Sequence, residues 1–256
     1  MNLKNLALPF LISGSVAFAE GNAQRPYVTT ITSGSHVIAK DRGLFKGDID
    51  EIVVASGSAF LMESNGKPFL ITAAHCVVLS NEQAAEITKC NENKVEMGEI
   101  RISGFALKPT RFLLDSANDI AVVELAAEDI KLLNLRPLKS TEPKLPCDAM
   151  VWGFPFKPGD GGVVANQVGT PDLRKATISH IDTRMLTASI DNGQTGSGYS
   201  GGPMVVGDSD NVIGVTVAIV PGVGNAQTRG CNMKHVEALL AAFETKATKY
   251  SDPPIH

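Results

Sequence analysis

Short apolar runs closed off by turn residues repeat along most of the chain, and this pattern limits the possible folds more than any other feature. The runs are rich in Val and Ile, and Gly, Asn, Asp and Pro stand between them. Such runs predict the short strands of a β-sandwich or a β-barrel. A first series of predicted strands covers 51–56, 59–63, 68–72, 99–105 and 119–125, and a second series covers 149–153, 176–180, 185–190, 203–206 and 212–220.

A stretch of different character, residues 126–146, separates the two series. It contains three prolines and a pattern typical of helical turns, so it is the predicted linker. The sequence therefore predicts an all-β fold of two units, at 51–136 and 137–250. The second unit ends in a predicted C-terminal α-helix, because apolar residues recur there at helical spacing, namely Val236, Leu239, Leu240 and Phe243.

The composition excludes several classes of protein. With 43% apolar and 20% charged residues among 256, the chain is too apolar for a disordered protein and long enough to bury a core. The formal net charge is −4, and Lys and Arg are scattered, so no nucleic-acid partner is expected. No apolar run reaches the roughly 18–20 residues of a membrane-spanning helix, so no membrane span is expected.

Residues 1–19 have the three parts of a signal peptide. Lys4 supplies the positive charge, 6–18 form a short apolar stretch, and Ala17 and Ala19 fit the cleavage site. Export by this signal predicts a periplasmic or extracellular protein in an oxidising compartment. Residues 20–50 carry no clear pattern and remain an N-terminal leader of uncertain structure, whether an early strand, a propeptide or a flexible leader.

Three segments at the edges of predicted strands carry the residue types of nucleophilic catalysis, in the order His, Asp, Ser. They read Thr-Ala-Ala-His-Cys at 72–76, Asp-Ile-Ala-Val-Val-Glu-Leu at 119–125 and Gly-Tyr-Ser-Gly-Gly-Pro at 198–203. A serine hydroxyl becomes a good nucleophile when an imidazole takes its proton, and a carboxylate holds that imidazole in the required tautomer. The glycines let the backbone turn sharply, so that two N–H groups can point at one oxyanion.

These segments resemble those of the chymotrypsin-like serine peptidases, in which TAAHC, DIAL-type and GDSGGP-type motifs occur in the same order. The resemblance implies two six-stranded antiparallel β-barrels with the active site in the cleft between them. It makes His75 the general base, Asp119 the carboxylate that orients it, and Ser200 the nucleophile. The backbone N–H groups of Gly198 and Ser200 would form the oxyanion hole. The implied function is that of a serine endopeptidase acting on protein or peptide substrates.

Two further segments extend the resemblance. Trp-Gly-Phe-Pro at 152–155 is similar to the segment that opens the second barrel, and 212–219 is similar to the strand beside the substrate in HtrA (Deg) proteases. No PDZ module is expected, since few residues follow Ala241. We expect a monomer, and we expect no cofactor and no metal, because no metal-ligand spacing occurs among the Cys and His residues.

Alternatives remain for one residue and for the function. Asp115 competes with Asp119 for the role of the acid, although the apolar residues after Asp119 favour the latter. The segment 198–202 also fits the G-x-S-x-G elbow of α/β-hydrolases, but that fold needs its acid and its His after the serine. The alternative functions are a protease-like binding protein with little turnover and an esterase using the same triad.

The four cysteines allow three pairings. In the resembling family, the cysteine after the catalytic His usually pairs with an upstream cysteine, which this chain lacks near 59–60. We therefore expect one disulfide between Cys76 and Cys90 and another between Cys147 and Cys231, as in some trypsins. Free buried thiols are the alternative.

The resemblance also places a primary specificity pocket. By motif offset, Gln194 lies at its base, Thr195 follows, and Val217, Ala218 and Ile219 form one wall. The pocket has no Asp at its base and lacks the His of glutamyl endopeptidases. We expect a shallow pocket that takes small or medium uncharged P1 side chains.

Two positions depart from the family pattern. Val217 stands where many members have a Ser or Thr that donates to the triad carboxylate, so Asp119 should depend on other donors. Tyr199 stands where digestive members have an Asp that pairs with a newly cut N-terminus. Because Tyr199 carries no charge at neutral pH, activity is not expected to require a cut at one defined bond.

Overall fold

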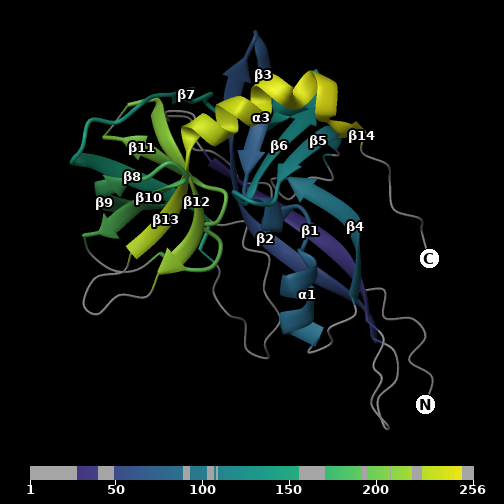
Figure 1. Cartoon of the computed structure of the whole chain (residues 1–256). Helices are drawn as coiled ribbons and strands as arrows, with labels where there is room; N and C mark the ends of the chain where they lie inside the picture. Colours follow the sequence, from purple (N-terminus) through teal and green to yellow (C-terminus); the bar gives the residue numbers. More distant parts are fainter. Residues whose placement is uncertain are drawn as a thin grey trace.

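The structure is a computed structural model that describes residues 28–39, 49–88, 93–102, 107, 109–155, 171–191, 195–207, 209–220 and 227–249. The predicted signal peptide, Cys90 and Gln194 lie outside these residues. The described chain is built from two seven-stranded sheets and a helix that packs against both (Figure 1). None of the helices in the described part of the chain combines the length and the apolar character needed to cross a membrane.

The second sheet closes into a barrel. Its order is β11-β8-β9-β10-β13-β12-β7, and an additional pairing of β11 with β12 closes six of the strands, while β7 adds to β12 in parallel. The barrel interior is apolar and includes Val151, Ile178, Leu186 and Met204. The strands are β7 (Lys139–Ser140), β8 (Cys147–Gly153), β9 (Asp172–Ile181), β10 (Met185–Ile190), β11 (Pro203–Val206), β12 (Asn211–Val220) and β13 (Gln227–Asn232).

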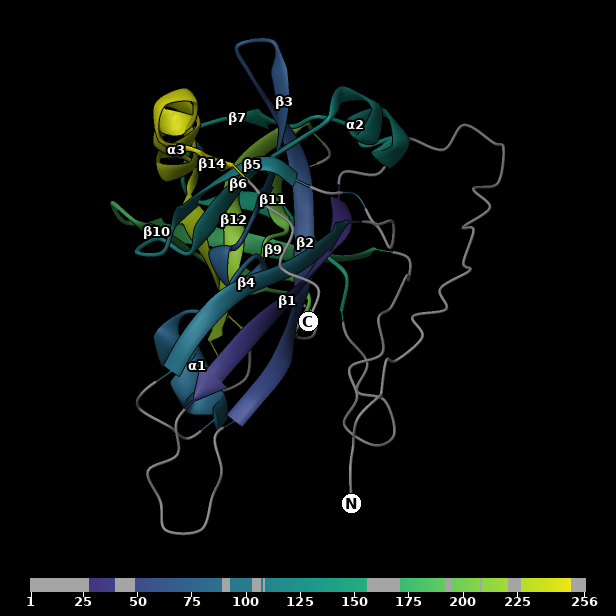
Figure 2. The ribbon, with the colours of Figure 1, turned by 90° about the vertical axis from the view of Figure 1, so that its right-hand side faces the viewer.

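The first sheet is curled but, among the described residues, not closed, so the prediction of two six-stranded barrels is confirmed in part: the fold is one closed six-stranded barrel and one curled half-barrel. Its order is β14-β5-β6-β3-β2-β1-β4, and the described residues of the outer strands β14 and β4 do not pair. The first two strands are long and extend as an arm with β4 and α1 (Asn81–Thr88) beyond the rest of the sheet (Figure 2). The strands are β1 (Val28–Ala39), β2 (Ile49–Ser64), β3 (Lys67–Thr72), β4 (Asn93–Ile102), β5 (Pro109–Asp115), β6 (Ile120–Leu125) and β14 (Thr248–Lys249).

Strand β2 runs without a break through Gly57 and Ser58, where two separate strands were predicted. Gly57 is needed at this point because a Cβ there would lie 2.3 Å from Cys76 Sγ and 2.5 Å from the Ser200 carbonyl oxygen. The backbone of β2 therefore touches the loop of the second unit that carries Ser200.

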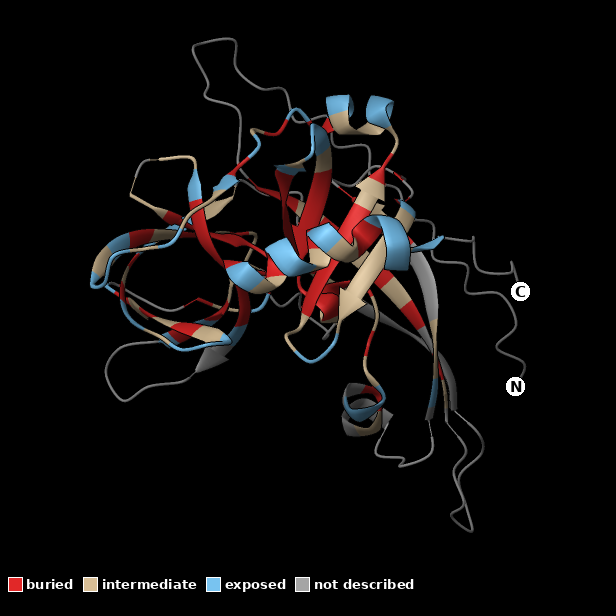
Figure 3. Cartoon of the chain, turned by 45° about the horizontal axis from the view of Figure 1, so that its top comes forward, coloured by how far each residue is buried: buried red, intermediate tan, exposed pale blue. Residues whose placement is uncertain are grey.

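The predicted C-terminal helix is confirmed as α3 (Met233–Lys246). Asn232 caps its first turn by accepting a hydrogen bond from Lys234 N at 3.1 Å. The helix buries Val236, Leu240 and Phe243 in the same core as residues of both sheets, and its outer face is exposed (Figure 3). The predicted linker contains a shorter helix, α2 (Ala127–Leu133).

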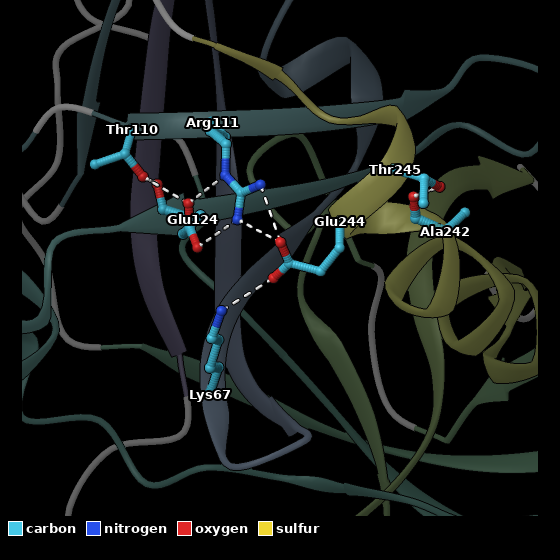
Figure 4. A network of polar contacts seen from close by, with 7 residues as sticks. All are labelled: Lys67, Thr110, Arg111, Glu124, Ala242, Glu244 and Thr245. Carbon is cyan, nitrogen blue, oxygen red and sulfur yellow. Dashed lines mark hydrogen bonds and ion pairs between the residues drawn. The ribbon is translucent and has the colours of Figure 1, made fainter.

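A polar network fastens α3 to the first sheet (Figure 4). The Arg111 guanidinium donates to both oxygens of Glu124 on β6 and to Glu244 on α3, and Lys67 Nζ lies 3.0 Å from Glu244 Oε1. The guanidinium carbon also lies 5.0 Å from the ring centroid of Phe243. Because α3 follows β13 directly, it joins the second unit to the first.

Candidate active site

His75 lies in a single 3-10 turn, Ala74–Cys76, that follows β3. Its ring Nδ1 lies 2.7 Å from Asp119 Oδ2, and its backbone N–H donates to Asp119 Oδ1 at 3.0 Å. The N–H of Ala74 donates to the Asp119 carbonyl at 3.1 Å. Asp119 thus holds the His75 turn with its backbone and with both carboxylate oxygens.

Asp119 adopts this position from a left-handed backbone conformation, with φ of 54°, that Asp tolerates better than most residues. Asp115, the competing acid, instead accepts hydrogen bonds from Asn118 N at 3.2 Å and from Asn118 Nδ2 at 2.6 Å. Of the two carboxylates, the one in contact with His75 is therefore Asp119.

Asn118, the residue before Asp119, makes polar contacts with the second unit. Asn118 Oδ1 accepts from Arg184 Nε at 3.0 Å, and Asn118 Nδ2 lies 3.3 Å from His235 Nδ1. Arg184 lies between β9 and β10, and His235 is on α3. His235 is accordingly a contact between the two units.

The surroundings of His75 favour its protonated form. Burial by itself lowers the pKa of the imidazole, but the hydrogen bonds with Asp119 and Cys76 outweigh this and raise the pKa above its ordinary value of 6.5. The Nδ1–Asp119 contact also keeps a proton on Nδ1, so that in the neutral ring Nε2 is the free acceptor.

The loop that carries Ser200 is fixed by backbone contacts from both units. The Ser200 carbonyl accepts from Ser58 N at 2.7 Å and lies 3.7 Å from Cys76 Sγ, next to His75 in the chain. Gly201 N donates to the Thr216 carbonyl on β12 at 2.7 Å. The structure therefore places the Ser200 loop against the His75 turn.

Ser58 is a contact that sequence reasoning missed. Its hydroxyl donates to the Gly198 carbonyl at 2.6 Å and accepts from Phe154 N at 3.0 Å. It bridges the Ser200 loop and the segment after β8. Nothing in the sequence around Ser58 marks it, because the contact joins residues 140 positions apart.

The backbone N–H groups of Gly198 and Ser200 are the ones that the resemblance assigns to the oxyanion hole. Among the residues that the structure describes, neither amide has an acceptor. Gly198 takes a φ of 99° and Gly201 a φ of 84°, which favour glycine. A Cβ on Gly201 would lie 2.1 Å from the Ser58 carbonyl oxygen. This backbone can direct two N–H groups at one anionic oxygen.

Tyr199, between these two amides, is buried with an exposed fraction of 1%. Its hydroxyl donates to Asp172 Oδ2 at 2.5 Å and accepts from Arg174 Nε at 3.2 Å. Asp172 and Arg174 were also missed from the sequence. The two residues are two positions apart on β9, so their side chains lie on the same face of the strand, but nothing in the nearby sequence links them to Tyr199.

The residues predicted for the specificity pocket are only partly described. Thr195 is buried and hydrogen-bonds through its hydroxyl with the Thr228 hydroxyl of β13. Val217 is buried and Ala218 exposed on β12. A register irregularity falls between Thr216 and Ala218, and beyond it the backbone of Ile219 pairs with Thr228. Gln194 lies outside the described residues.

The predicted pairing of Cys147 with Cys231 is wrong, since both are free thiols. Two strands separate β8 from β13 in either direction around the barrel, so the two cysteines lie on opposite walls. Cys231 packs in the core shared with α3, whereas Cys147 packs against the barrel interior. Cys76 is also a free, buried thiol, and its predicted partner Cys90 is outside the described residues.

Comparison with known proteins agrees with this architecture. No curated protein sequence matches the chain. The fold is similar to the Rv3671c protease from M. tuberculosis in its active form, with 19% identity, a TM-score of 0.53, and coverage of 90% of this chain and 84% of that chain.

Two other solved structures share the fold. The thermostable serine protease AL20 from an extremophilic microorganism is 13% identical, with a TM-score of 0.51 and coverage of 87% of this chain and 99% of that chain. A Glu endopeptidase in complex with MPD is 17% identical, with a TM-score of 0.50 and coverage of 82% and 90%. Residues 57–215, more than half of the chain, match the trypsin-like peptidase domain, and the chain therefore belongs to the trypsin-like peptidase family.

Proposed function

We propose that this protein is an exported serine endopeptidase with the triad His75, Asp119 and Ser200. The observation that carries the proposal is the contact of His75 Nδ1 with Asp119 at 2.7 Å, beside a serine loop whose Gly198 and Ser200 amides are free among the described residues. Family membership supports a peptidase. Residues 1–19 support export to the periplasm or the outside of the cell.

The proposed reaction begins when Ser200 Oγ attacks the carbonyl carbon of the scissile peptide and His75 Nε2 takes the hydroxyl proton. Asp119 holds the Nδ1 proton and stabilises the imidazolium that forms. The carbonyl oxygen becomes an oxyanion, which accepts hydrogen bonds from Gly198 N and Ser200 N. The C–N bond then breaks, the leaving amine takes the proton from Nε2, and water hydrolyses the acyl-enzyme by the same steps.

The test is covalent labelling by a fluorophosphonate probe, combined with cleavage of a peptide library. Wild type should be labelled, and Ser200→Ala and His75→Ala should not. The matched control is Asp115→Asn, which should be labelled at the wild-type rate because Asp115 does not contact His75. Absence of labelling in folded wild type would favour a binding protein, and labelling with cleavage of esters alone would favour an esterase.

The same library tests the proposed preference for small or medium uncharged P1 side chains. Thr195, which adjoins the serine loop, is neutral, and its hydroxyl is already bonded to Thr228. The described part of the predicted pocket wall, Val217 and Ala218, carries no charge. Cleavage mainly after Arg, Lys or Glu would contradict this proposal.

A further inference from the structure

We propose that Asp172 and Arg174 are positioning residues that hold the oxyanion-hole loop in its working shape through the phenol of Tyr199. The inference rests on the proposed peptidase function, since it assigns the control of that same site. It also adds two residues on β9 to the machinery.

Tyr199 is the residue through which this loop can be held. It lies between Gly198 and Ser200: the peptide unit after it carries Ser200 N, and the peptide unit before it carries the Gly198 carbonyl, so a shift of Tyr199 displaces both residues whose amides would bind the oxyanion. Its own backbone groups are used within the loop, since Tyr199 N donates to the Gly196 carbonyl at 3.3 Å and its carbonyl accepts from Gly202 N at 2.8 Å. The side chain is therefore the part of Tyr199 that contacts β8 and β9 of the barrel wall, in addition to the backbone hydrogen bonds of Gly201 and Gly202 with Thr216 on β12.

The Tyr199 ring packs on the barrel wall at Gly153. A Cβ on Gly153, at the end of β8, would lie 2.6 Å from Tyr199 Cδ1 and 2.7 Å from Tyr199 Cα. The absence of a side chain at Gly153 therefore lets the ring pack directly on the strand. Gly153 and Asp172 are paired across β8 and β9, so the surface under the ring and the acceptor of its hydroxyl belong to one rigid ladder.

The hydroxyl is held by a pair of opposite charges. It donates to Asp172 and accepts from Arg174 Nε, while Arg174 Nη2 lies 2.7 Å from Asp172 Oδ2. Hydrogen bonds to charged partners are shorter and stronger than those between neutral groups. Loss of these partners would leave a partly buried hydroxyl unpaired, which is destabilising. Displacement of the loop would leave the phenol in that state, so the pair favours the loop conformation seen here.

The Tyr199 phenol keeps its proton over the pH range in which it must donate this hydrogen bond. Burial, and then the hydrogen bond to Asp172, raise the pKa of Tyr199 to about 12. The phenol therefore remains a donor at neutral and mildly alkaline pH. A loop held through the Tyr199 phenol does not need an ion pair with a newly cut N-terminus.

The test uses the full chain with Tyr199→Phe, which removes the hydroxyl and keeps the ring. We expect kcat for a peptide substrate to fall about 10- to 100-fold, as for the loss of one hydrogen bond to a charged group, with KM within about twofold of wild type. Inhibition by a peptide aldehyde, whose adduct carries an oxyanion, should weaken in proportion to kcat. Asp172→Ala should behave alike, and Asp172→Asn, which keeps an acceptor oxygen, should recover part of the loss.

Two controls separate positioning from general stability. The double variant Tyr199→Phe/Asp172→Ala should lose little more kcat than either single variant, because both changes act through one contact. Glu142→Gln removes an exposed ion pair with Lys234, 2.8 Å long, and should leave kcat unchanged. Circular dichroism and the unfolding midpoint show that each variant is folded at the assay temperature.

Amide hydrogen exchange of the segment 195–204 gives a readout that does not depend on turnover. Exchange there should speed up in Tyr199→Phe and Asp172→Ala and remain unchanged in Glu142→Gln. If folded Tyr199→Phe matches wild type in kcat and in exchange, the positioning role is refuted. If wild type shows no turnover, the proposed peptidase function fails by itself, and the exchange result still decides whether the pair holds the loop.

Discussion

Substitution of Gly57 by Ala tests whether the first sheet shapes the serine loop. The new Cβ would lie 2.3 Å from Cys76 Sγ and 2.5 Å from the Ser200 carbonyl oxygen, whereas Cβ contacts below 3.0 Å are not found in proteins. To reach a separation of 3.0–3.4 Å, the Ser200 carbonyl must move by about 0.5–0.9 Å. That movement stretches its hydrogen bond with Ser58 N, which is 2.7 Å long in the native protein.

The expected magnitude follows from these two clashes. Overpacking of a close-packed core is destabilising by about 1–3 kcal/mol. A displacement of Ser200, the proposed nucleophile, by nearly 1 Å is expected to lower the rate by up to about 100-fold. Urea unfolding measures the first effect, and the rate of fluorophosphonate labelling of folded protein measures the second.

A second variant separates the two contacts. Gly57→Ala/Cys76→Ala removes the sulfur but retains the clash with the Ser200 carbonyl, so it should recover stability more than labelling. The control is Gly196→Ala in the same loop: among the described residues its new methyl group meets no atom within 4 Å, so the unfolding midpoint should not change. Wild-type stability together with wild-type labelling in Gly57→Ala would refute the reasoning.

Four further changes test other parts of the site and fold. Asp119→Asn should lower kcat about 10⁴-fold by favouring the wrong imidazole tautomer, whereas Asp115→Asn should stay near wild type in the same assay; the reverse order would identify Asp115 as the acid. Only neutral His75 accepts a proton, so kcat/KM should rise with pH through an inflection above 6.5, and Asp119→Asn should move this inflection down. The pKa of His75 is higher in the folded protein than in the unfolded chain, so protonation of His75 stabilises the fold. This stabilisation is complete below pH 6.5 and is lost as the pH rises through the pKa of His75 in the folded protein. Unfolding of wild type and of His75→Ala at a series of pH values measures it. Val217→Ser adds a hydroxyl where relatives donate to the triad carboxylate and should maintain or raise kcat; a loss of more than about tenfold would show that the hydroxyl finds no acceptor. Glu244→Gln weakens the contacts of Arg111 and Lys67 with α3, so it should slightly lower the unfolding midpoint at low salt. In 1 M salt, where the charges are screened, the variant and wild type should have equal midpoints.

Local patterns in the sequence predict the strands that keep a simple apolar character. The bounds of β10 and β11 agree with the runs at 185–190 and 203–206, and α3 follows from its helical spacing. Strand β1 remained one of three alternatives for residues 20–50, because Thr, Ser and Gly make up much of Val28–Ala39. Strand β13 was missed because its sequence, Gln-Thr-Arg-Gly-Cys-Asn, is polar and owes its conformation to pairing with β10 and β12.

The candidate site also has one part that local motifs predict and another part that they do not. The contact of His75 with Asp119 was expected from two local motifs, and the structure brings the two side chains together. Ser58, Asp172 and Arg174 were not expected, because sheet register, and not a local motif, carries them to the serine loop. The pairing of β14 with β5 was equally hidden, since it joins Thr248 with Phe112 across more than half of the chain.

The pairing of β14 with β5 and the packing of α3 have a consequence for the order of assembly during synthesis. Residues 28–125 leave the ribosome well before 233–249, and until then the outer edge of β5 has no partner and the core lacks Phe243, whose ring lies 4.9 Å from that of Phe69. The first sheet therefore completes its core only after the second barrel has been made. The contacts of Phe69 and Arg111 with α3 are therefore among the last to form, and until then one face of the first sheet lacks its apolar cover.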